Sequence, residues 1–293
     1  MTNNSERDIQ ALVSMVDEPD PEIYNEISSR LVSCGDEAMP FLENAYDRTV
    51  DSLMRERLDS LLHRIRYNQL SKSLLDWYTH DGNDLLYAWF EITRYFYPSF
   101  DKQDVKKHLE ALRKDIWLEM NDNLTALEQI KVFNHVFYNI HNFKGNIDDY
   151  HNPENSFINR VLERRIGNPL SLGVIYMLVA RDVDLPVRGI NLPEHFVLAY
   201  MGERFDTETM KIHHDQPLFY INAFSGGSIF SANGINTFLH KLNMEPLPAF
   251  FEPCSNAEII IRMLNNIIVS YDQAGQDSRT EGLESLRDKL QGL

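Results

Sequence analysis

The chain has 293 residues, and 43% of them are hydrophobic, which is enough for a sizeable core in one or two domains. It carries 44 acidic against 28 basic residues, a formal net charge of −16 that is spread along the sequence without a long acidic run. This charge repels phosphate backbones and anionic lipids, so we expect no nucleic acid and no membrane as a partner. The polar N-terminus and the lack of an 18-residue apolar run predict a cytoplasmic protein.

The two cysteines, Cys34 and Cys254, cannot by themselves form a disulfide framework or a zinc site. Cys34 precedes Gly35 at an expected helix end and is interpreted as structural. Cys254 lies just before the expected last long helix, whose dipole could activate the thiol, although a packed or idle thiol is the favoured interpretation. The pair His213–His214 has no matching ligand spacing. The sequence therefore predicts no metal and no cofactor.

Residues 1–122 are expected to be almost entirely helical. Apolar residues recur at helical spacing in segments 9–16, 23–32, 39–46, 53–65, 70–78, 84–96 and 104–121. The first four segments resemble a HEAT-type repeat pair, although a plain bundle would explain them equally well. A dense group of aromatic residues between Trp77 and Phe96 is interpreted as a helix-packing core rather than a ligand cage.

The stretch 168–200 organises the remainder of the chain. Asn168 can cap a helix, Pro169 suits the first helical position, and Ser171 falls in the first turn. The residues that follow are apolar on nearly every side, which predicts a helix that is buried all round. Segments 187–190 and 196–200 are predicted strands, and a break leads into His195.

Further strands are predicted at 203–207 and 218–222, separated by a polar loop, and a turn is predicted at 225–227. Helices are expected after this turn, at 234–242, 257–271 and 279–293. Strands joined by hairpin-length links indicate an antiparallel sheet. The predicted fold class is therefore α+β, with a helical N-terminal region, a core with a small sheet and a helical C-terminus.

A hydroxyl at a helix N-terminus and a histidine at the start of a strand are a pattern with chemical meaning. Helix N-termini stabilise anions, so cysteine enzymes place their thiolate there, with a histidine as the base. Two structural alternatives stay open. Ser171 can simply cap its helix, and His195 can be a hydrogen-bonded histidine of the core.

Several motifs in order resemble the bacterial SirB family of transglutaminase-like proteins. The matching segments are 150–172, Leu185–Pro186, the NLPEHF segment 191–196, residues 220–227 and residues 262–266, which together span about residues 125–272. The resemblance implies a transglutaminase or papain-like core at 123–253. It also implies that the C-terminal helices, 254–293, are a truncated tetratricopeptide-like segment of about one unit.

The resemblance also implies the site residues. Ser171 stands where a papain-like enzyme has its cysteine, His195 matches the family histidine, and Asn222 stands where the family more often has aspartate. We expect these three to converge, with Asp206 on the intervening strand as the alternative third member. The implied cleft residues are Asn155, Asn168, Pro193, Gly226 and Gly227.

Three functions remain open. The favoured one is a non-catalytic protein, a pseudoenzyme that binds a peptide or protein partner as scaffold or regulator. Its support is that a serine hydroxyl is a poorer nucleophile than a thiol, and that neutral Asn222 cannot stabilise an imidazolium by charge. The alternative is a hydrolase or acyltransferase with a Ser171–His195–Asn222 site. The third is a purely helical adaptor.

Overall fold

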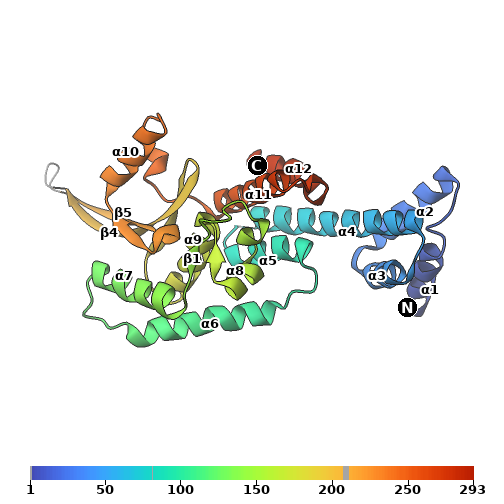
Figure 1. The fold of residues 1–293 in the computed structure, drawn as a ribbon, viewed down its shortest axis with the longest axis horizontal. Coiled ribbons are helices and arrows are strands. Elements are labelled where there is room, and N and C mark those ends of the chain that lie inside the picture. The colour runs from blue at the N-terminus through green and yellow to red at the C-terminus, as the bar shows by residue number, and fades with distance from the viewer. Residues whose placement is uncertain (1, 81, 207–210) are drawn as a thin grey trace. The chain divides into compact units, whose positions relative to one another are not determined.

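The computed structural model describes residues 2–80, 82–206 and 211–293 (Figure 1). The chain forms two compact units, Met1–Asp76 and Trp77–Leu293. The expected boundaries after residues 122 and 253 both fall inside the second unit. The reason is that helices on both sides of the core are tied to it; for example, Trp89 Nε1 donates a 2.9 Å hydrogen bond to the Ser156 carbonyl.

The first unit is helical, as expected. It contains α1 (Thr2–Val13), α2 (Pro21–Cys34), α3 (Met39–Arg48) and most of α4 (Ser52–Thr79). Their shared core is built from fully buried leucines such as Leu31, Leu42 and Leu58. Two separate helices were predicted where α4 runs without interruption, because residues 66–69 contain no glycine or proline to end the first one.

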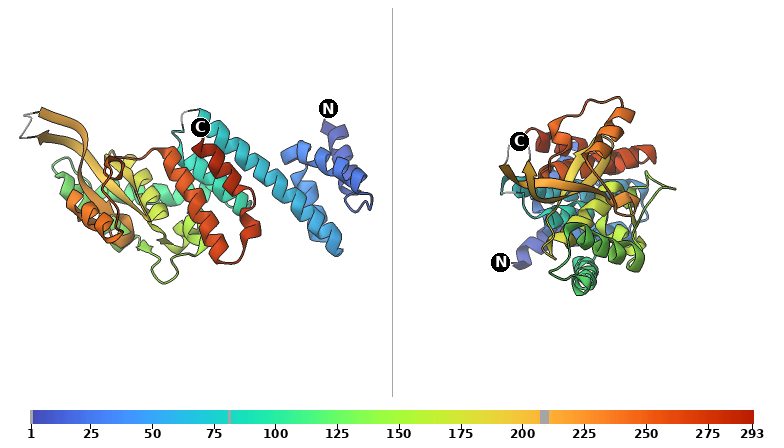
Figure 2. Two further views of the ribbon diagram at one scale, coloured as in Figure 1. Left: turned by 90° about the horizontal axis from the view of Figure 1, so that it is seen from above. Right: turned by 90° about the vertical axis from the view of Figure 1, so that its left-hand side faces the viewer.

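The second unit surrounds its sheet with helices. These are α5 (Leu85–Phe96), α6 (Lys102–Glu119), α7 (Ala126–Asn134) with its π-helical continuation His135–Ile140, α8 (Ile158–Arg164), α9 (Pro169–Arg181), α10 (Ala232–Lys241), α11 (Asn256–Gln273) and α12 (Leu283–Gln291). Figure 2 shows α11 and α12 side by side. The aromatic group of α5 belongs to the core, since Trp89 is fully buried and Phe96 stacks on Tyr271 of α11 at 5.2 Å between ring centroids.

The main sheet has four antiparallel strands in the order β3-β4-β5-β6, which confirms the α+β fold. The strands are β3 (Val187–Leu192), β4 (His195–Asp206), β5 (Lys211–Asn222) and β6 (Ser228–Phe230), and a separate parallel pair joins β1 (Lys144–Gly145) to β2 (Ile166–Gly167). The predicted strands 196–200 and 203–207 are one strand, β4, as far as residue 206, with irregularities at Tyr200/Met201 and Gly202/Arg204; residue 207 lies outside the described residues. Strand β6 was not predicted.

The inner half of β4 is buried on both faces. On one face, the side chains of Phe196 and Leu198 pack on α9. The contact is close, because a Cβ added to Gly173 would lie 2.7 Å from the Phe196 ring. On the other face, Val197 and Ala199 share a cluster with Ile235 and Leu239 of α10. Because successive side chains of a strand point to opposite faces, odd-numbered residues face α10 and even-numbered residues face α9.

No helix in the described part of the chain combines the length and the apolar composition that crossing a bilayer requires.

The close approach of α9 to the sheet can be tested with Gly173→Ala. The added methyl group would press into the Phe196 ring, so overpacking of roughly 1–3 kcal/mol should outweigh the gain of about 1 kcal/mol in helix propensity. We expect a lower free energy of unfolding in urea. The control is Gly292→Ala, whose Cβ would meet its nearest neighbour at an ordinary 3.5 Å. A Gly173→Ala chain as stable as this control would contradict the tight packing.

Candidate functional site

The N-terminus of α9 is closed by a reciprocal capping box. The Asn168 side-chain oxygen accepts a hydrogen bond from the Ser171 N–H at 2.8 Å, and the Ser171 hydroxyl accepts one from the Asn168 N–H at 3.0 Å. The same hydroxyl donates to the Asn168 carbonyl at 3.2 Å. The predicted cap is confirmed. A capping box satisfies helix N–H groups that have no partner within the helix, so this hydroxyl has a structural task.

The Ser171 hydroxyl is also shielded from solvent. The residue is 1% exposed, and a Cβ added to Gly167 would lie only 2.5 Å from its Oγ. The hydroxyl donates to the Asn168 carbonyl, and among the described residues no hydrogen bond joins it to a histidine. In this arrangement, Ser171 has neither the exposure nor the hydrogen bonding of an activated nucleophile.

His195 begins β4 directly after the tight turn Pro193–Glu194. A proline followed by a residue with positive φ, here 56° at Glu194, is typical of a type II turn. The His195 ring lies 5.9 Å from the Phe238 ring of α10, between centroids. Burial lowers the pKa of His195, a hydrogen bond to the Asn222 side chain partly offsets this effect, and the Arg262 charge lowers the pKa further. The imidazole is therefore neutral at pH 7.

Asn222 ends β5 and caps the short turn that follows. Its side-chain oxygen accepts hydrogen bonds from the Phe224 and Ser225 N–H groups at 3.1 and 3.2 Å. The residue thus orients His195 without supplying a charge. Asp206, the alternative third member, lies at the opposite end of β4 from His195, and its side chain is outside the described residues.

The structure brings together two of the three residues that were expected to converge. The Asn222 side chain lies near enough to the His195 ring to raise its pKa, and this ring lies on the face of the sheet that carries α10. Ser171 belongs to α9, which packs on the other face through Gly173 and Phe196. The difference from the expected triad arises from the alternation of β4, since the residue that faces α9 is Phe196 rather than its neighbour His195.

A cavity of about 1230 Å³ opens beside these elements, within the second unit. Its walls come from the start of α9, the β3–β4 turn, the loop before α8, and α11. Two of the expected cleft residues, Asn168 and Pro193, line it. Gly226 and Gly227 lie instead in the turn before β6, where the Gly227 carbonyl accepts a 2.8 Å hydrogen bond from Asn134.

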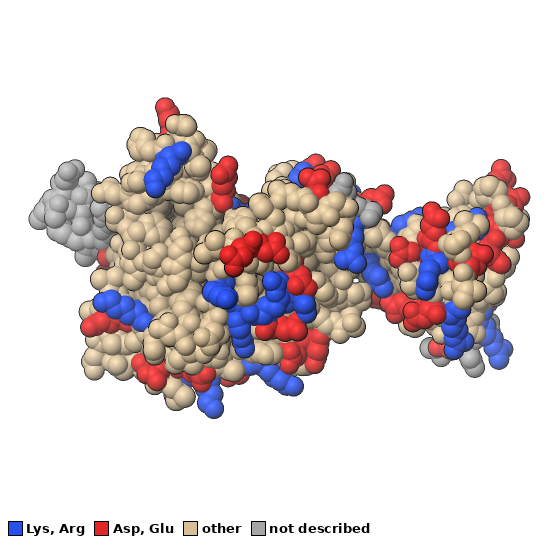
Figure 3. All heavy atoms as spheres, viewed as in Figure 1, with Lys and Arg blue, Asp and Glu red and all other residues tan. Residues whose placement is uncertain are grey.

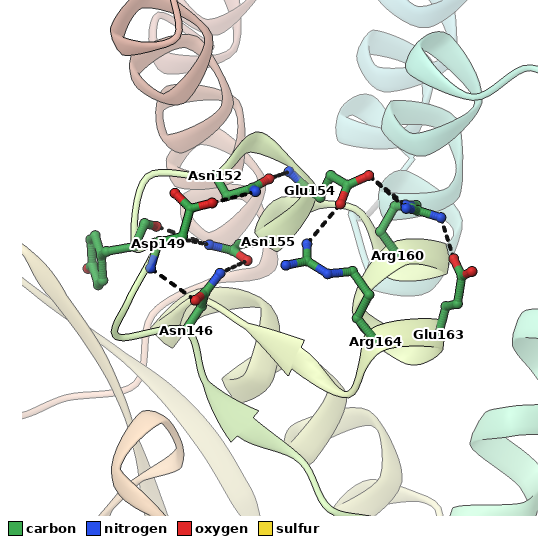
Figure 4. A network of polar contacts seen from close by, with 9 residues as sticks. Asn146, Asp149, Asn152, Glu154, Asn155, Arg160, Glu163 and Arg164 are labelled. Carbon is green, nitrogen blue, oxygen red and sulfur yellow. Dashed lines mark hydrogen bonds and ion pairs between the residues drawn. The ribbon is translucent and has the colours of Figure 1, made fainter.

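Asn155, the remaining expected cleft residue, is completely buried behind the cavity wall. Its amide nitrogen donates to the Asp149 and Tyr150 carbonyls at 2.9 and 3.1 Å, and its oxygen accepts from Asn146 at 2.9 Å (Figure 4). Glu154 is paired with Arg160 and Arg164 in the same network. Asn155 therefore shapes the cavity by holding the loop that carries Tyr150, which lines the cavity.

Arg262 is the cavity residue that the sequence did not assign a role. It belongs to a segment that carried the family resemblance, and it is the only Lys or Arg of α11, a helix rich in apolar residues such as Ile259 and Met263. That contrast was the available signal. Burial lowers the pKa of Arg262, which remains charged because the ordinary pKa of an arginine lies far above neutral pH.

Cys254 is not activated by the nearby start of α11. Burial raises the pKa of its thiol to about 12, with a further contribution from the Glu258 charge. The activated-thiol hypothesis is therefore wrong, and the packed thiol is the correct interpretation. Among the described residues, no three His, Cys, Asp or Glu side chains gather as a metal site requires.

The comparisons with known proteins agree with the architecture. A model of the transglutaminase-like superfamily matches residues 103–265, more than half of the chain, so the protein belongs to this superfamily. Within it, the chain is similar to a UPF0162 protein of Xylella fastidiosa, strain 9a5c, at 28% identity over 60% of each chain. The UPF0162 protein YchA of Escherichia coli K12 is 27% identical over 64% of this chain and 65% of its own length.

A mammalian relative shares the same region. F-box only protein 21 of Mus musculus is 28% identical over 55% of this chain, which is 24% of that protein. The chain spans about 60% of the length of the UPF0162 protein of Xylella fastidiosa. No solved structure matches the chain.

The environment of His195 predicts a pH dependence of stability. Its pKa is lowered in the folded state, so the unfolded chain binds the proton more readily once the pH falls below about 6.5. The free energy of unfolding should therefore decline as the pH is lowered through this range. In His195→Gln, this part of the decline should be absent, and urea titrations from about pH 7.5 to about 5.5 would measure the difference. If the free energy of unfolding declines equally with falling pH in both proteins, the lowered pKa of His195 is contradicted.

Proposed function

We propose that this protein is a transglutaminase-like domain without a catalytic nucleophile, which binds a peptide or protein partner in the cavity of its core as a scaffold or regulator. The observation that carries the proposal is that, among the described residues, the Ser171 hydroxyl bonds only to Asn168 and forms no hydrogen bond with His195. The hydroxyl is buried in a capping box on α9, whereas His195 faces α10. Covalent catalysis needs a nucleophile and a base within hydrogen-bond reach.

The other elements of a catalytic site are also weak. Asn222 provides no negative charge to stabilise an imidazolium, and the thiol of the second unit, that of Cys254, is held protonated by burial. A hydrolase or acyltransferase would require Ser171 to leave both hydrogen bonds to Asn168 and to approach the other face of the sheet. This alternative therefore has less support.

The cavity supports the binding part of the proposal. At about 1230 Å³, it has room for several side chains of a peptide, and its walls mix apolar groups such as Phe196 and Ile261 with polar ones such as Asn168. On the face drawn in Figure 3, acidic and basic side chains occur in small groups, and its described residues form no continuous basic surface. Together with the net charge of −16, this favours a peptide or protein over a nucleic acid or a membrane.

The relatives add one further argument. The matched region occupies 24% of the mouse F-box only protein 21 but 60% of the Xylella UPF0162 protein. The same region thus occurs in chains of very different length, which is typical of a module that contributes an interaction to its parent protein.

The proposal is tested by Ser171→Cys. A thiol at an activated position, at a helix N-terminus and beside a histidine, has a pKa lowered to about 3.5–7.5 and alkylates rapidly at about pH 6. Because position 171 is buried and takes part in the cap of α9, we expect iodoacetamide to label the variant no faster than Cys254. The measurement is the labelling rate of each cysteine by mass spectrometry of the folded full chain.

The control for this experiment is Ser225→Cys, which places a thiol at an exposed turn position without any activating group. This variant should label at the rate of an ordinary free thiol. Labelling of Ser171→Cys faster than this control, together with a loss of that rate in His195→Gln, would contradict the proposal and favour the hydrolase or acyltransferase.

A further inference from the structure

Arg262 is held firmly at the wall of the cavity. Its Nη1 group donates one hydrogen bond to the Asn191 side-chain oxygen and another, at 2.5 Å, to the Leu192 carbonyl. Both acceptors lie at the end of β3, immediately before the turn that leads to His195. In the described part of the structure, the Nε and Nη2 groups of Arg262 donate no hydrogen bond. Three N–H donors of a fixed guanidinium thus remain for another partner.

The charge of Arg262 is not balanced by a carboxylate. The groups that act on it most are the Tyr150 hydroxyl and the Cys254 thiol, whose pKa values are raised above their usual ones by burial, so that both are neutral at pH 7. Among the described residues, no Asp or Glu forms an ion pair with Arg262. A partly buried cation without a counter-charge is unfavourable, and an anion that enters the cavity would remove this cost.

The other lining residues limit which anion would fit. Among the described residues that line the cavity, Arg262 is the only Lys or Arg, while Glu194 and Glu258 are both present. A phosphate dianion or an acidic run would meet more negative than positive charge there, within a chain of net charge −16. A single carboxylate avoids this repulsion and matches the planar fork of a guanidinium.

The chemistry next to Arg262 indicates what would carry the carboxylate. Apolar side chains of Leu170, Phe196 and Ile261 line the same cavity, and the Asn168 amide lies at the start of α9. A peptide provides this combination of one charged group, apolar side chains and backbone amides. An inorganic anion would leave the apolar walls unused.

We propose that Arg262 anchors one carboxylate of a peptide segment that binds in this cavity, with apolar residues beside that carboxylate on the peptide. This inference rests on the proposed function, because it identifies the chemistry of the partner that the non-catalytic core binds. The Nη1 group holds Arg262 on β3, and the Nε and Nη2 groups donate hydrogen bonds to the carboxylate. The carboxylate belongs either to an Asp or Glu side chain or to a free C-terminus.

The experiment uses three pools of acetylated hexapeptides with random residues at the remaining positions, restricted to uncharged ones. The first pool has Gln at a fixed position and an amidated C-terminus, so it has no carboxylate. The second has Glu in place of Gln, and the third has Gln with a free C-terminus. Retention on the immobilised full chain is measured by mass spectrometry, and dissociation constants are then measured by fluorescence anisotropy for the best peptide and its matched neutral form.

We expect the second or the third pool to bind at least about tenfold more tightly than the first, since hydrogen bonds to charged groups are the strong ones. The pool that binds identifies the source of the carboxylate. In Arg262→Gln this preference should vanish, and in Arg262→Lys it should be reduced. The control Arg181→Gln removes one exposed charge outside the cavity and should leave the preference intact.

The comparison of the pools is made on the unaltered chain, so a loss of stability in an Arg262 variant cannot imitate the result. Ala257→Trp, which places a bulky ring in the cavity from α11 without a change of charge, separates the two proposals. Equal binding of all three pools that is abolished by Ala257→Trp overturns the carboxylate anchor and leaves the proposed function standing. If no pool binds, or if Ala257→Trp does not abolish the binding that is seen, both the carboxylate anchor and the proposed function are overturned.

Discussion

The geometry of the core depends on one strand that is buried on both faces. The β4 backbone passes between α9 and α10, so neighbouring residues belong to different environments: Phe196 packs against Gly173 of α9, and His195 packs against Phe238 of α10. A shift of one residue would exchange every side chain of the strand between the two helices. The turn at Pro193–Glu194, which pairs Leu192 with His195, fixes this register. The separation of the serine from the histidine follows from it.

The local features of the site were predictable because they depend on neighbouring residues. Asn168, Pro169 and Ser171 form a helix start whose cap involves only backbone and side-chain atoms within three residues. The side of the sheet on which His195 lies was not predictable in this way. The segment Phe196–Tyr200 is apolar throughout, since both faces are covered, and a run without alternation does not indicate which residue faces which helix.

Other differences have similar physical origins. Arg262 stands out locally as the only cation of α11, but its role depends on Asn191 and Leu192, which are about 70 residues away in sequence. The cavity likewise forms between segments that are distant in the chain. The buried Asn155 was expected to lie at the surface of the cleft, yet it fixes the loop from behind. Its burial costs little because its nitrogen donates to two backbone carbonyls and its oxygen accepts from Asn146.

Membership of the transglutaminase-like superfamily and the lack of a visible triad are compatible, since a fold supplies positions and the side chains supply chemistry. In this chain, a helix N-terminus, a strand histidine and a strand asparagine are all present. The serine hydroxyl, however, is used to cap α9, and the neighbouring cavity carries an unbalanced arginine. These features favour the proposed peptide-binding protein over a hydrolase or acyltransferase.

The central claim, that Ser171 and His195 lie on opposite faces of the sheet, is most directly tested by disulfide trapping. In a chain with Cys34 and Cys254 replaced by alanine, two pairs are compared under mild oxidation, with the fold monitored by circular dichroism. The first is G167C/S171C, since a Cβ added to Gly167 would lie 2.5 Å from the Ser171 Oγ, and the second is S171C/H195C. A disulfide requires Cβ atoms within about 4.5 Å, so we predict rapid cross-linking of the first pair and none of the second. Cross-linking of the second pair at a comparable rate in the folded chain would contradict the account.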